Sequence, residues 1–190
     1  MQQLGTLRLE TPRLILRRFE AKDAPAAFAN WESDEAVTRF LRWQACTSLA
    51  QTEQILRGWI DGYVRSDFYL WAIVPKDGSD APIGTISVVE MDRQIKAAEL
   101  GYCIGKEFWN RGYTTEAMQA VLAFLFDCVG MNRISAQHDP RNPASGAVMR
   151  KCGLRYEGTL RQADFNNQGI VHAAVYVILA SEYHTERRIK

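Results

Sequence analysis

The sequence lacks the clustered cysteines and histidines that hold a metal ion. It has four cysteines and three histidines in 190 residues, with no C-x-x-C pair and no zinc-ligand spacing. They are Cys46, Cys103, Cys128, Cys152, His138, His172 and His184. Scattered cysteines in a chain without a secretion signal indicate the reduced thiols of a cytosolic protein, and no metal is expected.

Long apolar runs are also absent. The first ten residues, MQQLGTLRLE, lack the apolar stretch of a signal peptide, and no stretch approaches the ~20 apolar residues of a membrane span. Export and membrane insertion are therefore not expected, and the predicted location is cytoplasmic. Because the net charge is only +1, composition predicts neither nucleic acid nor a membrane as a partner. Any anion must be bound by a local site.

The dinucleotide-binding pattern G-x-G-x-x-G is missing, and so are internal repeats, low-complexity stretches and linkers. What is present is an ordinary globular composition, 47% hydrophobic and 24% charged. A chain of this length can bury a sizeable core without disulfides or metals. We therefore predict one domain over residues 1–190.

The most informative stretch runs from Glu99 to Phe126 and predicts a strand, a short polar turn and a helix. Its helical part has apolar residues at i, i+3, i+4, i+7, i+8 and i+11, the spacing of a helix with one buried face. These are Ala117, Ala120, Val121, Phe124, Leu125 and Cys128. A glycine-containing turn before a helix leaves backbone N–H groups unpaired, and such groups bind anions, phosphates above all. We interpret this turn as a site for the pyrophosphate of a coenzyme.

The whole chain predicts the order strand, two helices, three strands, helix, strand, helix, two strands. The predicted strands span residues 11–19, 68–74, 83–90, 97–104, 132–138, 155–161 and 169–180, and the helices follow Asp23, Ser48, the turn 106–114 and Asn142. We expect Ser48 and Gln51 to form a capping box, residues 162–168 to be a loop and the charged tail to be solvated. A meander followed by strand–helix–strand predicts a mixed sheet with one parallel crossover pair.

Four segments resemble the GNAT superfamily of N-acetyltransferases, and within it the Rim-type ribosomal-protein N-acetyltransferases. They are ELGYCIG with WNRGYTTEA, DPRNPASGAVMRKCGLRYEG, TPRLILRRFEAKDA and VYVILASEY, and they cover nearly the whole chain. The resemblance implies an α+β fold, with a mixed, mostly antiparallel central sheet of about seven strands and about four helices. In the superfamily's turn motif, Arg/Gln-x-x-Gly-x-Gly/Ala, this chain has Trp109, Gly112 and Thr114, so only the central glycine is kept.

The resemblance also implies acetyl-CoA as co-substrate. Its pantetheine arm would lie along Leu100, Tyr102, Cys103 and Ile104, with an N–H near Cys103 meeting the thioester oxygen. Its pyrophosphate would lie at the turn, on Trp109, Asn110, Arg111, Gly112, Tyr113, Thr114 and Thr115. Asn142 and Ser145 match the Asn-x-x-Ala/Ser that contacts the coenzyme in the family. From the residues alone, two simpler interpretations stay open: Gly112 does no more than permit the turn, and Asn142 does no more than cap the helix.

Acetyl transfer to an amine needs one group that takes the amine's proton and one that protonates the leaving thiolate. The resemblance implies Ser145 as the acid, because Met149 stands where many members have a proton-donating tyrosine. Glu99, just before the pantetheine segment, is the predicted base, and His172 is a further candidate. Glu99 also fits a solvent-facing strand position, and Ser145 a helix surface. Cys103 is interpreted as a core residue rather than a nucleophile.

The acceptor side is predicted only in outline. Phe40 and Trp43, with Arg39, lie between the first two helices, and Tyr176 lies on the last strand; we expect them to line the acceptor pocket. The predicted function is acetyl-CoA-dependent N-acetylation of a primary amine by direct attack in a ternary complex, with a ribosomal-protein N-terminus as one acceptor. The alternatives are a small-molecule amine (polyamine, amino acid or aminoglycoside) and a non-catalytic acyl-CoA-binding module. A homodimer is compatible with the resemblance.

Overall fold

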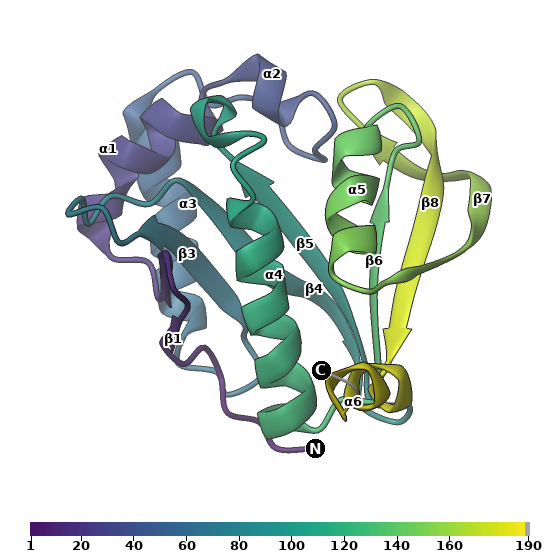
Figure 1. Cartoon of the computed structure of the whole chain (residues 1–190). Helices are drawn as coiled ribbons and strands as arrows, with labels where there is room; N and C mark the ends of the chain where they lie inside the picture. Colours follow the sequence, from purple (N-terminus) through teal and green to yellow (C-terminus); the bar gives the residue numbers. More distant parts are fainter. Residues whose placement is uncertain (189–190) are drawn as a thin grey trace.

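The chain folds into a central sheet of eight strands with helices packed on both faces (Figure 1). The computed structural model describes residues 1–188. The strands are β1 Leu9–Glu10, β2 Leu14–Arg17, β3 Leu70–Pro75, β4 Gly84–Asp92, β5 Ala97–Ile104, β6 Arg133–His138, β7 Arg155–Asn166 and β8 Gly169–Leu179. The helices are α1 Ala24–Ala27, α2 Glu35–Thr38, α3 Leu49–Gly62, α4 Tyr113–Ala123, α5 Pro143–Lys151 and α6 Ala180–Arg188. Shorter helical segments are η1 Ala21–Asp23, η2 Phe28–Glu32, η3 Lys106–Phe108 and η4 Phe124–Val129.

The sheet is antiparallel at every neighbouring pair except one. Its strand order is β1-β2-β3-β4-β5-β6-β8-β7, and only β5 and β6 run parallel. That pairing is short, from Ala97 opposite Arg133 to Glu99 opposite Ser135, so the two strands part after Glu99. At the same level β4 has a bulge between Val88 and Glu90. The sheet therefore opens in its middle, where backbone groups of β5 have no neighbouring strand.

Two apolar cores hold the sheet from its two faces. On one face, Met118 of α4 packs with residues of β2 and β3 such as Leu16 and Trp71, and all three are fully buried. On the other face, Trp31 of η2 and Leu56 of α3 pack against β3. Every residue of β3 is buried, as expected for a strand covered on both sides. This rigid half of the sheet supports the strand β5 at which it opens.

The predicted fold class and element order are confirmed, and β5 has the predicted bounds. The structure adds the two-residue strand β1. The predicted loop over residues 162–168 is wrong in its first part. Strand β7 continues to Asn166, because pairing with β8 extends to the Asn166–Gly169 pair and leaves a two-residue turn.

One further local prediction is wrong, and one is not contradicted. The charged tail, predicted to be solvated, forms α6 as far as Arg188, with Tyr183 stacked on Phe126 at 4.8 Å between ring centroids and with His184 and Thr185 exposed. Residues 189–190 of the tail lie outside the described residues. The capping box at α3 is not formed. Ser48 occupies the N-cap position without a side-chain cap bond, and the Gln51 side chain accepts from the Thr47 N–H at 2.8 Å. At α3, the Gln51 side chain thus bonds to the backbone N–H of Thr47 instead of that of Ser48.

Candidate active site

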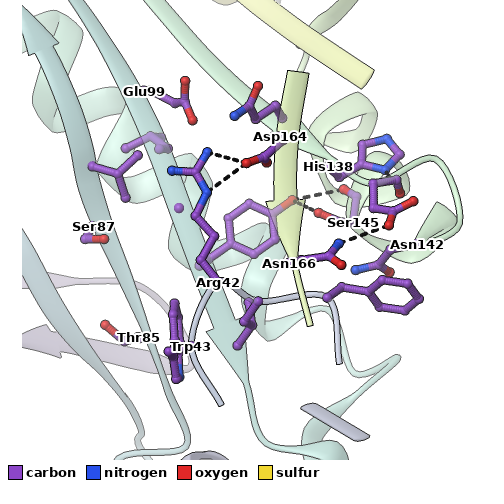
Figure 2. Close-up of a pocket in the computed structure, with 18 residues that line it drawn as sticks. Arg42, Trp43, Thr85, Ser87, Glu99, His138, Asn142, Ser145, Asp164 and Asn166 are labelled. Carbon is purple, nitrogen blue, oxygen red and sulfur yellow. Dashed lines mark hydrogen bonds and ion pairs between the residues drawn. The ribbon is translucent and has the colours of Figure 1, made fainter. Parts of the chain in front are cut away.

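A cavity of about 210 Å³ lies where β5 and β6 part. Its walls come from β4, β5, the end of β6, the start of α5, residues 40–43 and the tip of the β7–β8 hairpin. Seven residues selected from the sequence line it (Figure 2): Phe40, Trp43, Glu99, Leu100, Tyr102, Asn142 and Ser145. Folding thus brings the predicted base, acid and acceptor-side residues to one place.

The open edge of β5 offers backbone groups to this cavity. The Gly105 N–H donates at 2.8 Å to the carbonyl oxygen of Ile83, the residue just before β4, and successive residues of a strand direct their N–H groups to alternate sides. The N–H groups of Leu100, Tyr102 and Ile104 therefore face the side where β6 has turned away, and that of Cys103 faces β4. The edge beside Cys103, rather than Cys103 itself, is available to a ligand.

The acid candidate Ser145 is hydrogen-bonded to a tyrosine. The Tyr102 hydroxyl lies 2.9 Å from Ser145 Oγ and 3.0 Å from the Ser145 carbonyl oxygen (Figure 2). Burial raises the pKa of Tyr102, although its hydrogen bond to Ser145 works in the opposite direction. A phenol that keeps its proton can donate to Ser145 and leave the serine's own proton free for a ligand in the cavity. Two hydroxyls from β5 and α5 thus form one hydrogen-bonded pair.

Glu99 lies half-buried in the same cavity. Burial raises its pKa, with Glu90 and Asp164 adding to the effect, while the nearby Arg42 cation lowers it. A carboxylate with a raised pKa accepts a proton more readily than a solvated one. Glu99 is therefore partly withdrawn from solvent, unlike a fully exposed strand residue.

An ion pair that the sequence did not predict lies next to Glu99. Arg42 binds Asp164 Oδ1 through Nε at 2.9 Å and through Nη2 at 2.8 Å. The pair joins residues 40–43 to the tip of the β7–β8 hairpin. Asn167 strengthens this connection, since its side chain donates to the carbonyl oxygens of Thr38 and Trp43 at 2.9 and 2.7 Å. The acceptor-side wall is thus held by side chains from distant segments.

The turn before α4 has the predicted backbone form. Gly112 is the N-cap residue with φ 77°, and Asn110 is also left-handed with φ 59°. The first helical hydrogen bond runs from the Glu116 N–H to the Gly112 carbonyl at 3.0 Å, so the N–H groups of Tyr113 to Thr115 precede the helical ladder. These groups and the positive end of the helix dipole suit a bound phosphate.

Arg13 holds this turn from the side. Its Nε lies 2.6 Å from Glu116 Oε2, its Nη1 donates to the Arg111 carbonyl at 3.0 Å, and its guanidinium lies 4.8 Å from the Tyr113 ring centroid. Burial raises the pKa of Glu116, but hydrogen bonds from Thr11 and Arg13 outweigh it and hold the pKa below its ordinary value. The negative charge of Glu116, close to the anion site, is thereby compensated by Arg13.

The start of α5 presents an amide to the cavity. Asn142 is the N-cap residue, but its side chain forms no cap bond, and it points among the cavity side chains in Figure 2. Within residues 1–188 it has no hydrogen-bond partner for its side-chain amide. The position of the N-cap is confirmed, whereas capping does not account for this side chain.

Comparison with known proteins decides the family. Residues 13–155 match the protein family described as "Acetyltransferase (GNAT) domain", which is most of the chain. The chain belongs to the GNAT acetyltransferases. It is therefore an enzyme of the N-acetyltransferase class, and the relatives given next agree with the Rim-type subgroup.

Named relatives match this chain over different lengths. The chain is 33% identical to the "Uncharacterized N-acetyltransferase YoaA" of Bacillus subtilis over 90% of this chain and 96% of that protein. It is 29% identical to the ribosomal-protein-serine acetyltransferase of Escherichia coli over 51% of this chain and 54% of that one. The ribosomal L7/L12 N-acetyltransferase RimL, solved with coenzyme A, shares the fold with a TM-score of 0.81 at 23% identity, over 91% and 98% of the two chains.

Other sequence candidates lie outside the cavity of this GNAT domain. Cys103 is buried on the opposite side of β5, and burial raises the pKa of its thiol, as for a core cysteine. Tyr176 lies beneath α5, where its hydroxyl accepts from Arg150 at 3.0 Å. Met149, at the family's tyrosine position, is buried in the core. His172 accepts from the Gln162 N–H at 2.9 Å in the β7–β8 hairpin.

The cavity contains ionisable residues for which the sequence had no local signal. Arg42, His138 and Asp164 line it, whereas Arg39, the arginine considered from the sequence, stacks on Phe40 outside it. These residues come from three segments without a shared motif, so only the fold could select them. In the described residues 1–188, no helix is long and apolar enough to cross a membrane. Over the same range, no group of three His, Cys, Asp or Glu side chains is placed to hold a metal ion.

Proposed function

We propose that this GNAT enzyme transfers an acetyl group from acetyl-CoA to a primary amine by direct attack within a ternary complex. The observation that carries the proposal is the joint presence, in one cavity, of Glu99, the Tyr102–Ser145 hydroxyl pair and the open edge of β5. Glu99 supplies the base and the hydroxyl pair the acid. The edge supplies hydrogen-bond donors for the thioester.

The proposed coenzyme site is continuous with this cavity. The pyrophosphate would be bound by the N–H groups of Tyr113 to Thr115, beside Gly112, whose lack of a side chain leaves the backbone accessible. The pantetheine arm would pair with the outward N–H and C=O groups of β5 from Leu100 to Ile104. The Asn142 amide is free to reach the same arm from α5.

The proposed reaction balances within these groups and solvent. Glu99 takes a proton from the amine, directly or through water, and the neutral nitrogen attacks the thioester carbonyl carbon. Outward N–H groups of β5 stabilise the negative charge on the carbonyl oxygen. The C–S bond then breaks, and the thiolate takes the proton of Ser145, which Tyr102 replaces. Tyr102 regains its proton from the second proton that the nitrogen loses, passed on by solvent, and Glu99 releases the first proton to solvent. Holding both reactants together removes much of the entropic barrier.

For the acceptor we propose the N-terminal amine of a protein, with a ribosomal protein as the first candidate. The support is similarity to relatives named ribosomal-protein acetyltransferases, at 29% identity or below. The residues of the acceptor wall are Phe40 and Trp43, and their aromatic surfaces suit an amino-acid side chain next to the amine. Small-molecule amines are the competing acceptors in the test that follows.

The test is acetyl-CoA-dependent release of free thiol in a panel of N-terminal peptides, amino acids, polyamines and aminoglycosides. We expect thiol release with at least one class, and none without an acceptor amine. Coenzyme binding by calorimetry without thiol release in any arm would indicate the non-catalytic acyl-CoA-binding module. Absence of coenzyme binding would overturn the proposal as a whole.

A further inference from the structure

Arg42 brings a guanidinium into the reaction cavity next to the proposed base. Both Arg42 and Glu99 line the cavity, and the electrostatic effect of Arg42 on the Glu99 carboxylate shows that they are close. Figure 2 shows the guanidinium between Glu99 and Asp164. In a site that must receive an ammonium group, a fixed cation requires an explanation.

Stability does not explain it. The Arg42 side chain is 49% exposed, and ion pairs this exposed contribute about 0–1 kcal/mol. Moreover, the pair uses one carboxylate oxygen only, since Oδ1 of Asp164 accepts from Arg42 and from the Phe165 N–H at 2.8 Å. What the pair does achieve is orientation, together with the Phe165 ring, whose centroid lies 5.7 Å from the guanidinium carbon.

The orientation leaves donors for a ligand. Nε and Nη2 of Arg42 bind Asp164, but Nη1 has no hydrogen-bond acceptor within the described residues 1–188. A guanidinium has five N–H groups in a rigid plane, so an ion pair on one edge fixes the direction of those on the other. Arg42 thus directs unused donors into the cavity that also holds Glu99.

We propose that Arg42 binds the oxygen of a carbonyl group attached to the acceptor's amine-bearing carbon, so that the enzyme selects α-amino carbonyl compounds. This inference rests on the proposed function. In such an acceptor a single carbon atom separates the amine nitrogen from the carbonyl carbon. When the ammonium faces Glu99, the carbonyl oxygen is therefore within reach of the neighbouring Arg42 donor. The second ammonium of a polyamine would instead meet the Arg42 cation and be repelled.

Two kinds of acceptor share this chemistry. A peptide N-terminus offers a neutral amide oxygen, which accepts from Nη1 while Asp164 keeps its place. A free amino acid offers a carboxylate, which competes with Asp164 for the guanidinium. The common requirement is an oxygen acceptor beside the amine, and the two sources differ in how they respond to the loss of Asp164.

The experiment compares kcat/KM for three acceptors of similar size: a short peptide with an amidated C-terminus, the matching free amino acid, and the matching amine without a carbonyl group. A hydrogen bond to a charged group contributes about 1.5–3 kcal/mol, so Arg42→Ala should lower kcat/KM about 10- to 150-fold for carbonyl-bearing acceptors. The plain amine, already a poor substrate of the unchanged enzyme, should change less than about 3-fold.

Arg65→Ala is the matched control. It removes an exposed arginine whose Nε binds Asp67 Oδ1 at 3.0 Å, and Arg65 is not among the residues that line the cavity. Unchanged coenzyme affinity of Arg42→Ala by calorimetry shows that the variant is folded. Asp164→Asn should raise KM for the peptide and favour the free amino acid relative to it, because the competing carboxylate is gone.

The outcomes are distinct. Equal losses on all three acceptors, or no loss in Arg42→Ala, would overturn the assignment while thiol release itself still supports the proposed function. Preference of the unchanged enzyme for the plain amine or for a polyamine would also overturn it. If the unchanged enzyme releases no thiol with any acceptor, both the proposed function and this inference fail.

Discussion

Tyr102 and Glu99 lie three positions apart on β5, yet each reaches the cavity with a different task. The two side chains leave opposite faces of the strand, and the parting of β5 from β6 exposes both. Burial raises the pKa of each, which makes the carboxylate a better proton acceptor and keeps the phenol protonated. The same physical effect thus favours the protonated form of both groups, which suits Glu99 as the proposed base and keeps a proton on the proposed hydroxyl pair.

Replacing the base should separate activity from stability. Glu99→Gln should lower kcat/KM by about 10²–10⁴-fold and abolish the rise of kcat/KM with pH that reports ionisation of Glu99. Its raised pKa in the folded protein means that the ionised form disfavours folding at neutral pH, so the variant should also unfold at a higher urea concentration. An unmoved pH–rate profile would show that Glu99 is not the base.

The hydroxyl pair should behave as a unit. Ser145→Ala and Tyr102→Phe should each lower kcat, by about 10–100-fold, with coenzyme affinity nearly unchanged, because each removes part of one proton path. The double variant should be little worse than the worse single variant. Losses that multiply in the double variant would mean that the two hydroxyls act independently and would argue against a relay.

The turn before α4 shows what an element can contribute without any particular side chain. Its phosphate-binding groups are backbone N–H groups, so the family's outer motif positions can hold Trp109 and Thr114 while Gly112 stays. Trp109 has its own task here, since its Nε1 donates to the Ile104 carbonyl at 2.9 Å and fastens the turn to the end of β5. The departure from the motif thus changes the side-chain contact that holds the turn against β5, and it leaves the backbone N–H groups of the turn as they are.

Gly112→Glu should weaken coenzyme binding at least 10-fold in calorimetry. The left-handed φ of 77° disfavours any side chain there, and a carboxylate would repel the pyrophosphate. Gly78→Glu is the matched control. Gly78 also has a left-handed φ, of 95°, but has open space around it and belongs to the turn between β3 and β4. If both variants bind coenzyme as the unchanged enzyme does, the turn is not the pyrophosphate site.

At the scale of the whole molecule, the β7–β8 hairpin forms one wall of the cavity that lies where β5 and β6 part. Asp164 holds Arg42, and Asn167 holds the same segment through backbone oxygens. In the β6–α5 turn, Asp139 accepts from Arg141 and from Asn166 at the hairpin tip, at 2.6 and 3.0 Å. The acceptor wall therefore depends on contacts among the β6–α5 turn, the hairpin and residues 38–43 together.

Asp139 makes this assembly sensitive to acid. Hydrogen bonds from Arg141 lower its pKa to about 2 against the opposing effect of burial. A lowered pKa stabilises the fold above the unfolded value near 4, and this contribution is lost as the pH falls from about 4 to about 2. Asp139→Asn should cost about 1–2 kcal/mol at pH 7, measured by urea unfolding, and the difference from the unchanged protein should shrink towards pH 2. A constant difference across that pH range would contradict this account.

Much of the fold could be predicted from the residues, because it depends on neighbours in sequence. The 3.6-residue spacing in α4, the alternation in β5 and the glycine of the intervening turn are local properties, and the structure confirms those elements. The tail α6 was missed because its reason is remote: Tyr183 stacks on Phe126 of η4. The hairpin extension was missed because polar residues 162–166 read as a loop until β8 pairs with them.

The same division holds for the site. Motif and turn pointed to the coenzyme side, including Glu99 and Ser145, because the contacts there lie within one strand–turn–helix unit and the helix that follows. On the acceptor side, Phe40 and Trp43 were predicted from the sequence, whereas the charged pair was decided by tertiary structure alone. Arg42 and Asp164 lie 122 positions apart, and nothing near either residue indicates the other. They meet because β5 and β6 part and the β7–β8 hairpin reaches over the opening, an arrangement of whole elements that no local pattern encodes.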